Sequence, residues 1–156
     1  MTPPMDKPFY QFTVLNEAKR FDFLSIGKKS IPKTIQFHQT NRSSFFMLVL
    51  ADLAPDDLLD TQTISNNGDM QIILATVFKA VDIFLAENPA AVVAFSGSNE
   101  ARTRLYQIAI ARELLALRER FNILGMANDE IEVFCKGKRY EAFLISLKNI
   151  NIEQFI

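Results

Sequence analysis

The stretch VVAFSGSNEARTRLYQIAI (residues 92–110) leads from an apolar run through Ser-Gly-Ser-Asn into a segment with helical periodicity. The apolar run at 90–95 is too short for a helix and is bounded by Pro89 and Gly97, so it predicts a buried strand. Residues 99–121 then carry apolar side chains at helical spacing. A strand, a glycine turn and a helix in this order predict a layer of helices on a sheet.

The predicted helix at 99–121 has two apolar faces. One stripe consists of Ala101, Leu105, Ile108, Leu115 and Ala116, and the other of Tyr106, Ile110, Leu114, Leu117 and Phe121. A helix that is apolar on both sides needs two neighbours. We expect the sheet to be one of them, and the other to be either the preceding helix or a second copy of the chain.

Strand patterns dominate the N-terminal third of the chain. Alternating apolar and polar residues predict strands at 10–15, 20–26 and 33–39. The continuous apolar run at 44–51 predicts a strand that is covered on both faces or lies at the centre of the sheet. We expect these four segments to form an antiparallel meander.

One more helix is predicted between this meander and residue 92. Apolar residues recur at helical spacing from Met70 to Leu85, Asp69 is a suitable N-cap, and Pro89 follows the end. Residues 52–69, just before this helix, form the most polar segment of the chain and predict a loop.

The C-terminal segments predict further strands. Residues 130–135 and 139–147 alternate on either side of a Lys-Gly-Lys turn at 136–138, which predicts a tight hairpin. The tail at 151–156 is short and apolar enough to dock. The complete pattern predicts an α+β fold of two layers, in which a mostly antiparallel sheet of about six or seven strands carries two main helices.

Length and composition predict one globular domain over residues 1–156, with 1–8 as a loose, proline-containing arm. Seventeen basic and 18 acidic residues leave a net charge of −1, which gives nucleic-acid binding no support but leaves a local basic patch open. The apolar runs are shorter than the ~20 residues of a membrane-spanning helix, and the N-terminus lacks the pattern of a signal peptide. We therefore expect a cytoplasmic protein without a membrane partner.

The turn Ser96-Gly97-Ser98-Asn99 is the first candidate site. A glycine turn that opens a helix exposes backbone N–H groups, and the helix dipole favours an anion there. The alternative is an ordinary helix start, with Ser98 as N-cap and Glu100 in the first turn. No Walker lysine or dinucleotide glycine pattern accompanies the turn.

Three side chains of the following helix extend this candidate anion site. Arg102 and Tyr106 are four residues apart and share a side of the helix, and Arg102 could offer a forked donor to a phosphate or carboxylate. Arg104 lies on the other flank. The helix alone cannot easily bring both arginines to one ligand, so we expect at least one of them to be structural.

The polar loop supplies further candidates. Asn66, Asn67 and Asp69 belong to an Asn-Asn-Gly-Asp sequence that is first of all typical of a turn. The acidic residues of this region are Asp52, Asp56, Asp57, Asp60 and Asp69. They lack the alternating ligands and terminal glutamate of an EF-hand, so we expect no metal and no cofactor.

The sequence names no catalytic residue. His38 is the sole histidine and lies in a strand pattern, where a polar residue on a sheet face is the ordinary interpretation and a general acid or base stays open. Cys135 is the sole cysteine, which excludes an intrachain disulfide, and we expect it to be buried.

Two sequence blocks resemble a known family. SNNGD-x4-LATV (residues 65–77) and FSGS-x3-RTRLYQ (residues 95–107) are together similar to blocks of an uncharacterised bacterial family, classed as a domain of unknown function. The second block is the more specific and includes Gly97, Ser98 and the run from Arg102 to Tyr106. The resemblance implies a complete small bacterial protein, and it supplies no activity or catalytic residues.

Two hypotheses about function follow. The first is a non-enzymatic binding or regulatory module that self-associates through the helix at 99–121 or binds a protein partner. The second is an enzyme or binding protein for a phosphate ligand or nucleic acid, which uses Ser96 to Asn99 with Arg102, Arg104 and Tyr106. The second hypothesis predicts a concave pocket where these groups meet the loop at 52–69.

Overall fold

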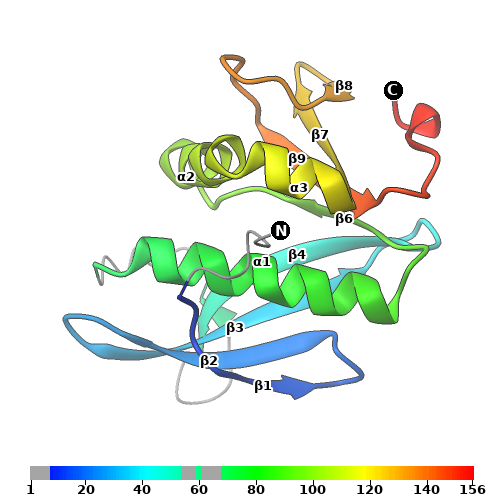
Figure 1. Ribbon diagram of the computed structural model, residues 1–156. Helices are drawn as coiled ribbons and strands as arrows, with labels where there is room; N and C mark the ends of the chain where they lie inside the picture. Colours follow the sequence, from blue (N-terminus) through cyan, green and yellow to red (C-terminus); the bar gives the residue numbers. More distant parts are fainter. Residues whose placement is uncertain (1–7, 54–58, 61–67) are drawn as a thin grey trace.

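The computed structural model describes residues 8–53, 59–60 and 68–156. These residues form an α+β fold with a mostly antiparallel sheet, as predicted (Figure 1). The strands are β1 (Phe12–Leu15), β2 (Arg20–Ile26), β3 (Ser30–Gln39), β4 (Phe45–Leu53), β5 (Leu59–Asp60), β6 (Val92–Phe95), β7 (Phe121–Ala127), β8 (Glu130–Val133) and β9 (Ala142–Leu147). The helices are α1 (Met70–Glu87), α2 (Glu100–Arg112), α3 (Leu114–Arg120) and the short 3-10 helix η2 (Ile152–Gln154).

Nine strands occur in the described residues, slightly more than the six or seven predicted. Their order across the sheet is β1-β2-β3-β4-β6-β9-β7-β8, and β5 pairs with β4 outside this path. The predicted N-terminal meander is confirmed, since β1 to β4 are successive antiparallel neighbours. The predicted loose arm falls almost entirely on residues 1–7, which lie outside the described residues.

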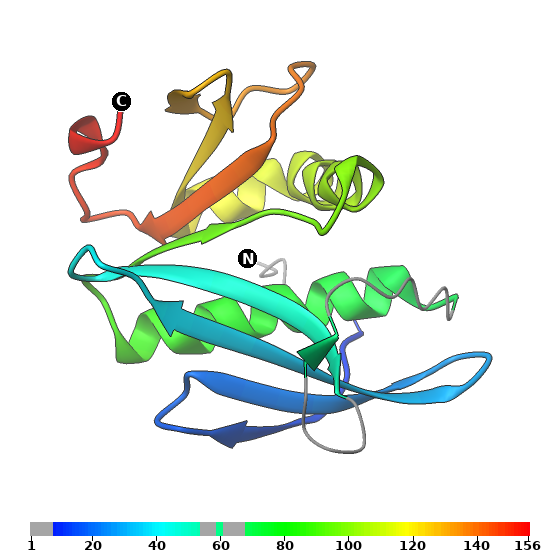
Figure 2. The same cartoon turned by 180° about the vertical axis from the view of Figure 1, so that it is seen from behind.

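The strands β4 and β6 are parallel and stay together over only three residue pairs, from Phe45↔Val92 to Met47↔Ala94. Beyond Met47, β4 continues beside β3, whereas β6 ends at Phe95 and the chain turns into α2. Figures 1 and 2 show the two strands diverging from their paired ends. The pairing between the two central strands is thus interrupted beyond Met47 and Ala94, toward the C-terminal ends of β4 and β6.

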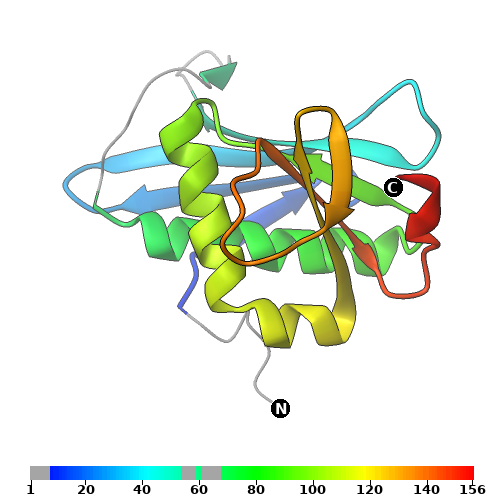
Figure 3. The same ribbon diagram turned by 90° about the horizontal axis from the view of Figure 1, so that it is seen from above.

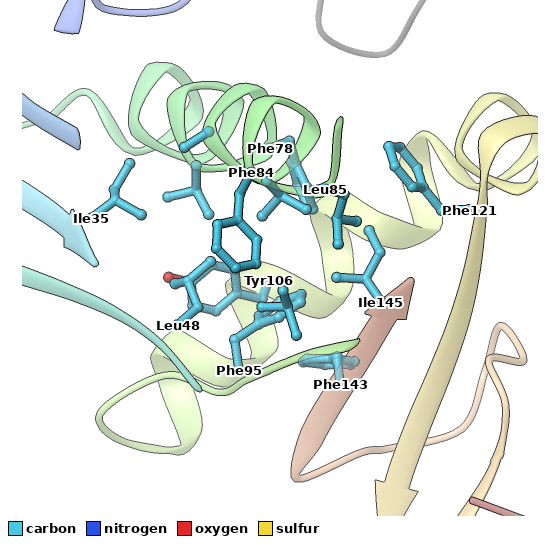
Figure 4. Close-up of a cluster of buried hydrophobic side chains, with 14 of the residues drawn as sticks. Ile35, Leu48, Phe78, Phe84, Leu85, Phe95, Tyr106, Phe121, Phe143 and Ile145 are labelled. Atoms are coloured by element: carbon cyan, nitrogen blue, oxygen red, sulfur yellow. The ribbon is translucent and has the colours of Figure 1, made fainter. Parts of the chain in front are cut away.

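The three α-helices contribute to one large core on a single face of the sheet. Figure 3 shows α2 running across the direction of α1. Phe84 of α1 stacks on Phe37 of β3, with ring centroids 4.1 Å apart, and makes an edge contact with Phe46 of β4 at 4.9 Å. Figure 4 shows how residues from α1, α2, β3, β4, β6 and β9 converge. Burial of this apolar surface is the main favourable contribution to folding.

The opposite face has a smaller cluster. Val92 and Ala94 of β6 pack there with Leu124 and Leu144, and Ile152 and Phe155 of the tail lie against them. The tail docks as predicted, and it covers the face of β6 that the helices leave open.

The helix predicted at 99–121 is wrong in one respect, because the structure divides it. The backbone of Glu113 has φ −107° and ψ 16°, which interrupts the helix between α2 and α3, and β7 begins at Phe121. Periodicity missed the break because Ile110, Leu114 and Leu117 keep helical spacing across it and are all buried.

The hairpin predicted around Lys136-Gly137-Lys138 is also wrong. The strand β8 pairs with β7, through a turn in which Asn128 and Asp129 have φ of 54° and 62°. Positive φ at both central residues is the requirement of a tight hairpin turn, which Asn and Asp tolerate. The strand β9 lies between β6 and β7 instead of beside β8. The prediction failed because the sequence pattern assigned no strand to residues 122–127, which form all of β7 except Phe121.

Candidate functional site

A pocket of about 200 Å³ opens where β4 leaves β6, between the first turns of α1 and α2. Its polar lining comes from Lys33, Asp52, Ser96, Ser98, Arg102 and Tyr106. Its apolar lining includes Leu48 and Leu50 of β4, Met70, Ile73 and Leu74 of α1, and Leu105 of α2. The candidate turn, Arg102 and Tyr106 therefore border one pocket.

Gly97 lets the turn lie directly against the first turn of α2. A Cβ atom at this position would come within 2.3 Å of the Thr103 nitrogen and 2.5 Å of the Arg102 carbonyl carbon. The Gly97 N–H donates to Thr103 Oγ1 at 3.0 Å, and that hydroxyl donates to the Asn99 carbonyl at 3.0 Å. The glycine thus serves close packing, and its N–H already has a partner inside the turn.

Asn99, and not Ser98, is the N-cap of α2. Its backbone is extended and its side-chain Oδ1 accepts from the Arg102 N–H at 2.9 Å. The prediction of Ser98 as N-cap is therefore wrong by one residue, because both residue types cap helices well. Ser98 instead lines the pocket.

Tyr106 lies at the bottom of the site. The residue is 5% exposed, and its ring makes an edge contact with Phe95 at 5.3 Å between centroids. Figure 4 shows its oxygen directed toward the side of Leu48. Burial raises the pKa of the Tyr106 phenol, and the positive charge of Arg102 lowers that pKa in part, which places the guanidinium near this ring. The phenol is therefore a protonated donor at neutral pH.

The Tyr106 hydroxyl has no hydrogen-bond partner in the part of the chain that the structure describes. In that same part, no fully buried side-chain nitrogen or oxygen lacks a partner. The hydroxyl oxygen must therefore keep some contact with solvent, and the pocket that Tyr106 lines provides it. A deeply placed donor that opens into a pocket is suited to bind a ligand atom.

Arg104 lies outside this site. Two residues along a helix turn by about 200°, so Arg102 and Arg104 face different sides. Arg104 is exposed and borders a second hollow, of about 580 Å³, together with Gln107 and Arg139. The prediction that both arginines cannot share one ligand from this helix agrees with this geometry.

Sequence reasoning missed Lys33 as a site residue. Lys33 and Asp52 are directly paired across β3 and β4, and their side chains form an ion pair. Lys33 is 6% exposed and lines the pocket with Asp52. The available signal was its position, because alternation places Lys33 on the same face of β3 as the buried Ile35 and Phe37. A charge at a core-facing position is uncommon unless it is paired.

Asp69 was predicted as the N-cap of α1 and considered as a loop residue of the candidate site, but its side chain has a different role. It precedes α1 as predicted, but its side chain makes no cap hydrogen bond. Its carboxylate accepts from Tyr10 Oη and Ser25 Oγ, both at 2.5 Å. Asp69 thereby anchors the segment before β1 and strand β2 to the start of α1. The other two loop candidates, Asn66 and Asn67, lie outside the described residues.

The other candidates are dispersed. His38 is exposed and its Nε2 contacts Gln36 Oε1 at 2.9 Å. Cys135 is exposed, so the prediction that it is buried is wrong. The strand β8 ends at Val133, and Cys135 falls in the loop beyond it. Residues 8–53, 59–60 and 68–156 contain no group of three or more His, Cys, Asp or Glu that could hold a metal ion.

Residues 6–148 match the profile of a protein family described as a family of unknown function, DUF6934. The chain belongs to DUF6934. The match includes the pocket and every candidate site residue of this DUF6934 protein. No curated protein and no solved structure matches the chain. Among the described residues, no helix is both long enough and apolar enough to cross a membrane.

Proposed function

We propose that this protein binds a small molecule with a phosphate or carboxylate group in the pocket between β4, β6 and α2. The observation that carries the proposal is the Tyr106 hydroxyl, which is deeply placed, protonated and unpartnered among the described residues, and which lies in a pocket bordered by Arg102. A guanidinium next to a neutral donor is a suitable pair for an anionic oxygen.

The charges around the pocket support an anion of low charge. Lys33 and Arg102 are cationic and Asp52 is anionic, so the charged residues of the described lining leave one net positive charge. The start of α2 adds the partial positive charge of a helix N-terminus. The pocket volume of about 200 Å³ favours a small molecule over nucleic acid.

The test is a thermal-shift panel of nucleotides, phosphate esters, carboxylates and short oligonucleotides. Because a ligand that binds the native state stabilises it, a true ligand at about a hundred times its dissociation constant raises Tm by roughly 5–10 °C. We expect Tyr106→Phe to weaken binding about tenfold by removing one hydrogen-bond donor, and Arg102→Ala to weaken it at least as much.

Arg104→Ala is the matched control, because it removes the same charge from the other flank of α2 and should leave the Tm shift unchanged. The proposal is wrong if no compound in the panel raises Tm, or if a compound does so equally in wild type and Tyr106→Phe.

A second candidate function is self-association or protein binding through the outer face of α2 and α3. One apolar stripe of this region is buried in the core, whereas Leu115 and Ile108 of the other are 81% and 45% exposed. These two large apolar side chains, one on α2 and one on α3, support the candidate if together they belong to one contiguous apolar patch. Light scattering should then give a mass above that of one chain, and Leu115→Glu should reduce it. A Leu24→Glu variant, on the distant β2, controls for added charge; a strictly monomeric wild type would refute self-association.

A further inference from the structure

Among the described residues, the edge of β4 that faces β6 has no partner strand along part of the pocket. On this edge β4 pairs with β6 only through Met47, and with β5 only at Asp52 and Leu53. The bridge between Met47 and Ala94 also engages the Leu48 N–H, so over residues 49–51 the described chain provides a partner strand on the β3 edge alone. A sheet strand with an unpaired edge presents N–H and C=O groups to which another extended chain can bond.

The direction of the backbone groups identifies the residue concerned. The Phe45 carbonyl accepts from the Thr40 N–H at 3.0 Å and so faces the β3 side. Backbone groups alternate between the two edges of a strand. The backbone groups of Val49 and Ala51 therefore point to β3, whereas those of Leu48 and Leu50 point to the other edge, where Leu50 has no partner strand among the described residues.

The pocket reaches this edge. Consecutive strand residues point to opposite faces of a sheet, so a pocket on one face is bordered by every second residue. Here Leu48, Val49, Leu50 and Ala51 all border the same pocket. Such a lining arises where a pocket meets the edge of the strand, and the Tyr106 hydroxyl opens into that same space.

We propose that the pocket takes an extended chain of secondary amides, which pairs with the backbone N–H and C=O of Leu50 and places its anionic end near Arg102. This assignment rests on the proposed ligand site and names the class of its ligand. Pairing with a free strand edge is a recurrent mode of recognition, in which main-chain hydrogen bonds supply affinity. At about 3.3 Å per residue, the open segment has room for roughly two or three amide units.

Two kinds of molecule share this chemistry: a nucleotide coenzyme with an amide-bearing arm, and a short phosphopeptide. Coenzyme A tests the first and is compared with the same nucleotide without its pantetheine arm. A capped phosphoserine tripeptide tests the second and is compared with free phosphoserine. Each pair keeps the phosphate and removes the amides.

The readout is amide hydrogen exchange at Leu50, followed by NMR in the full chain. In the free protein the Leu50 amide should exchange faster than those of Val49 and Ala51, which face β3. An amide-bearing ligand should slow exchange at Leu50 at least tenfold, and its partner without amides should not. The ligand pair that produces this difference identifies the source.

The outcomes separate the two proposals. A compound that raises Tm in a Tyr106-dependent way but leaves Leu50 exchange unchanged overturns the amide-chain assignment and keeps the anion site. A Leu50 amide that is as protected as Val49 in the free protein also overturns it, because the edge is then closed. If no compound in the panel binds, both proposals fail.

Discussion

Tyr106 and Tyr140 are 5% and 4% exposed, and burial is the largest cause that raises the pKa of each phenol. Their hydroxyls differ. Tyr140 Oη donates to Glu132 Oε2 at 2.7 Å and accepts from the Cys135 N–H at 3.0 Å, whereas the Tyr106 hydroxyl has no partner among the described residues. A buried hydroxyl that is fully bonded holds a fold together, while one that opens unbonded into a pocket is available to a ligand.

Two glycines, Gly125 near Tyr140 and Gly97 before the helix that carries Tyr106, extend this comparison. A Cβ at Gly125 would lie 2.5 Å from the ring of Tyr140, so the ring packs directly on β7. A Cβ at Gly97 would collide with the backbone at the start of α2, the helix that carries Tyr106. Gly125 therefore allows the Tyr140 side chain to pack on β7, whereas Gly97 allows the backbone of its turn to pack against the start of α2.

The largest expected effect is that of Gly97→Ala. Because the new methyl group would meet backbone atoms that cannot rotate away, we expect the free energy of unfolding to fall by ~3 kcal/mol. Urea denaturation measures the change. Ser96→Ala, at an exposed neighbouring position, is the control and should change stability by less than ~0.5 kcal/mol. An unchanged midpoint for Gly97→Ala would show that the turn is not packed as described.

The next effect separates the two tyrosines. Tyr140→Phe removes a donor to Glu132 and the acceptor for the Cys135 N–H, and should lower the free energy of unfolding by ~1–2 kcal/mol. Tyr106→Phe removes a hydroxyl without a described partner and should change it by less than ~0.5 kcal/mol. Equal losses in the two variants would contradict the difference between these residues. Chemical denaturation of both variants, without ligand, provides the measurement.

The smallest effect concerns alkaline pH. Burial and the hydrogen bond to Glu132 raise the pKa of Tyr140 from 10.0 to about 12 in the folded protein. As the pH rises, the Tyr140 phenol therefore loses its proton in the unfolded chain before it does so in the folded protein. The stabilising contribution of the protonated Tyr140 hydroxyl is complete below pH 10 and is lost as the pH rises toward about 12. Stability measured across this range should fall more steeply in wild type than in Tyr140→Phe. Parallel curves would refute the shift.

Local patterns predicted much of the chain. The alternation at 20–26 matches β2, and apolar periodicity with Asp69 and Pro89 on either side matches α1. Predictions failed where the local signal continued across a boundary, as at Glu113, or where a turn had two possible places, as between Asn128-Asp129 and Lys136-Lys138. In the second case the correct answer depends on β9, which enters the sheet between β6 and β7 and does not pair with β8.

The residues of the candidate site also fall into those that local sequence predicts and those that only the fold brings together. The sequence by itself determined that Arg102 and Tyr106 share one side of a helix behind a glycine turn and that Arg104 faces elsewhere, because helical geometry fixes the relation of residues a few positions apart. Only the tertiary structure decided that Lys33 and Asp52 join them, and that β4 parts from β6 beside a pocket. Pairing between distant strands depends on which surfaces pack together over the whole fold, and no short stretch of sequence encodes that.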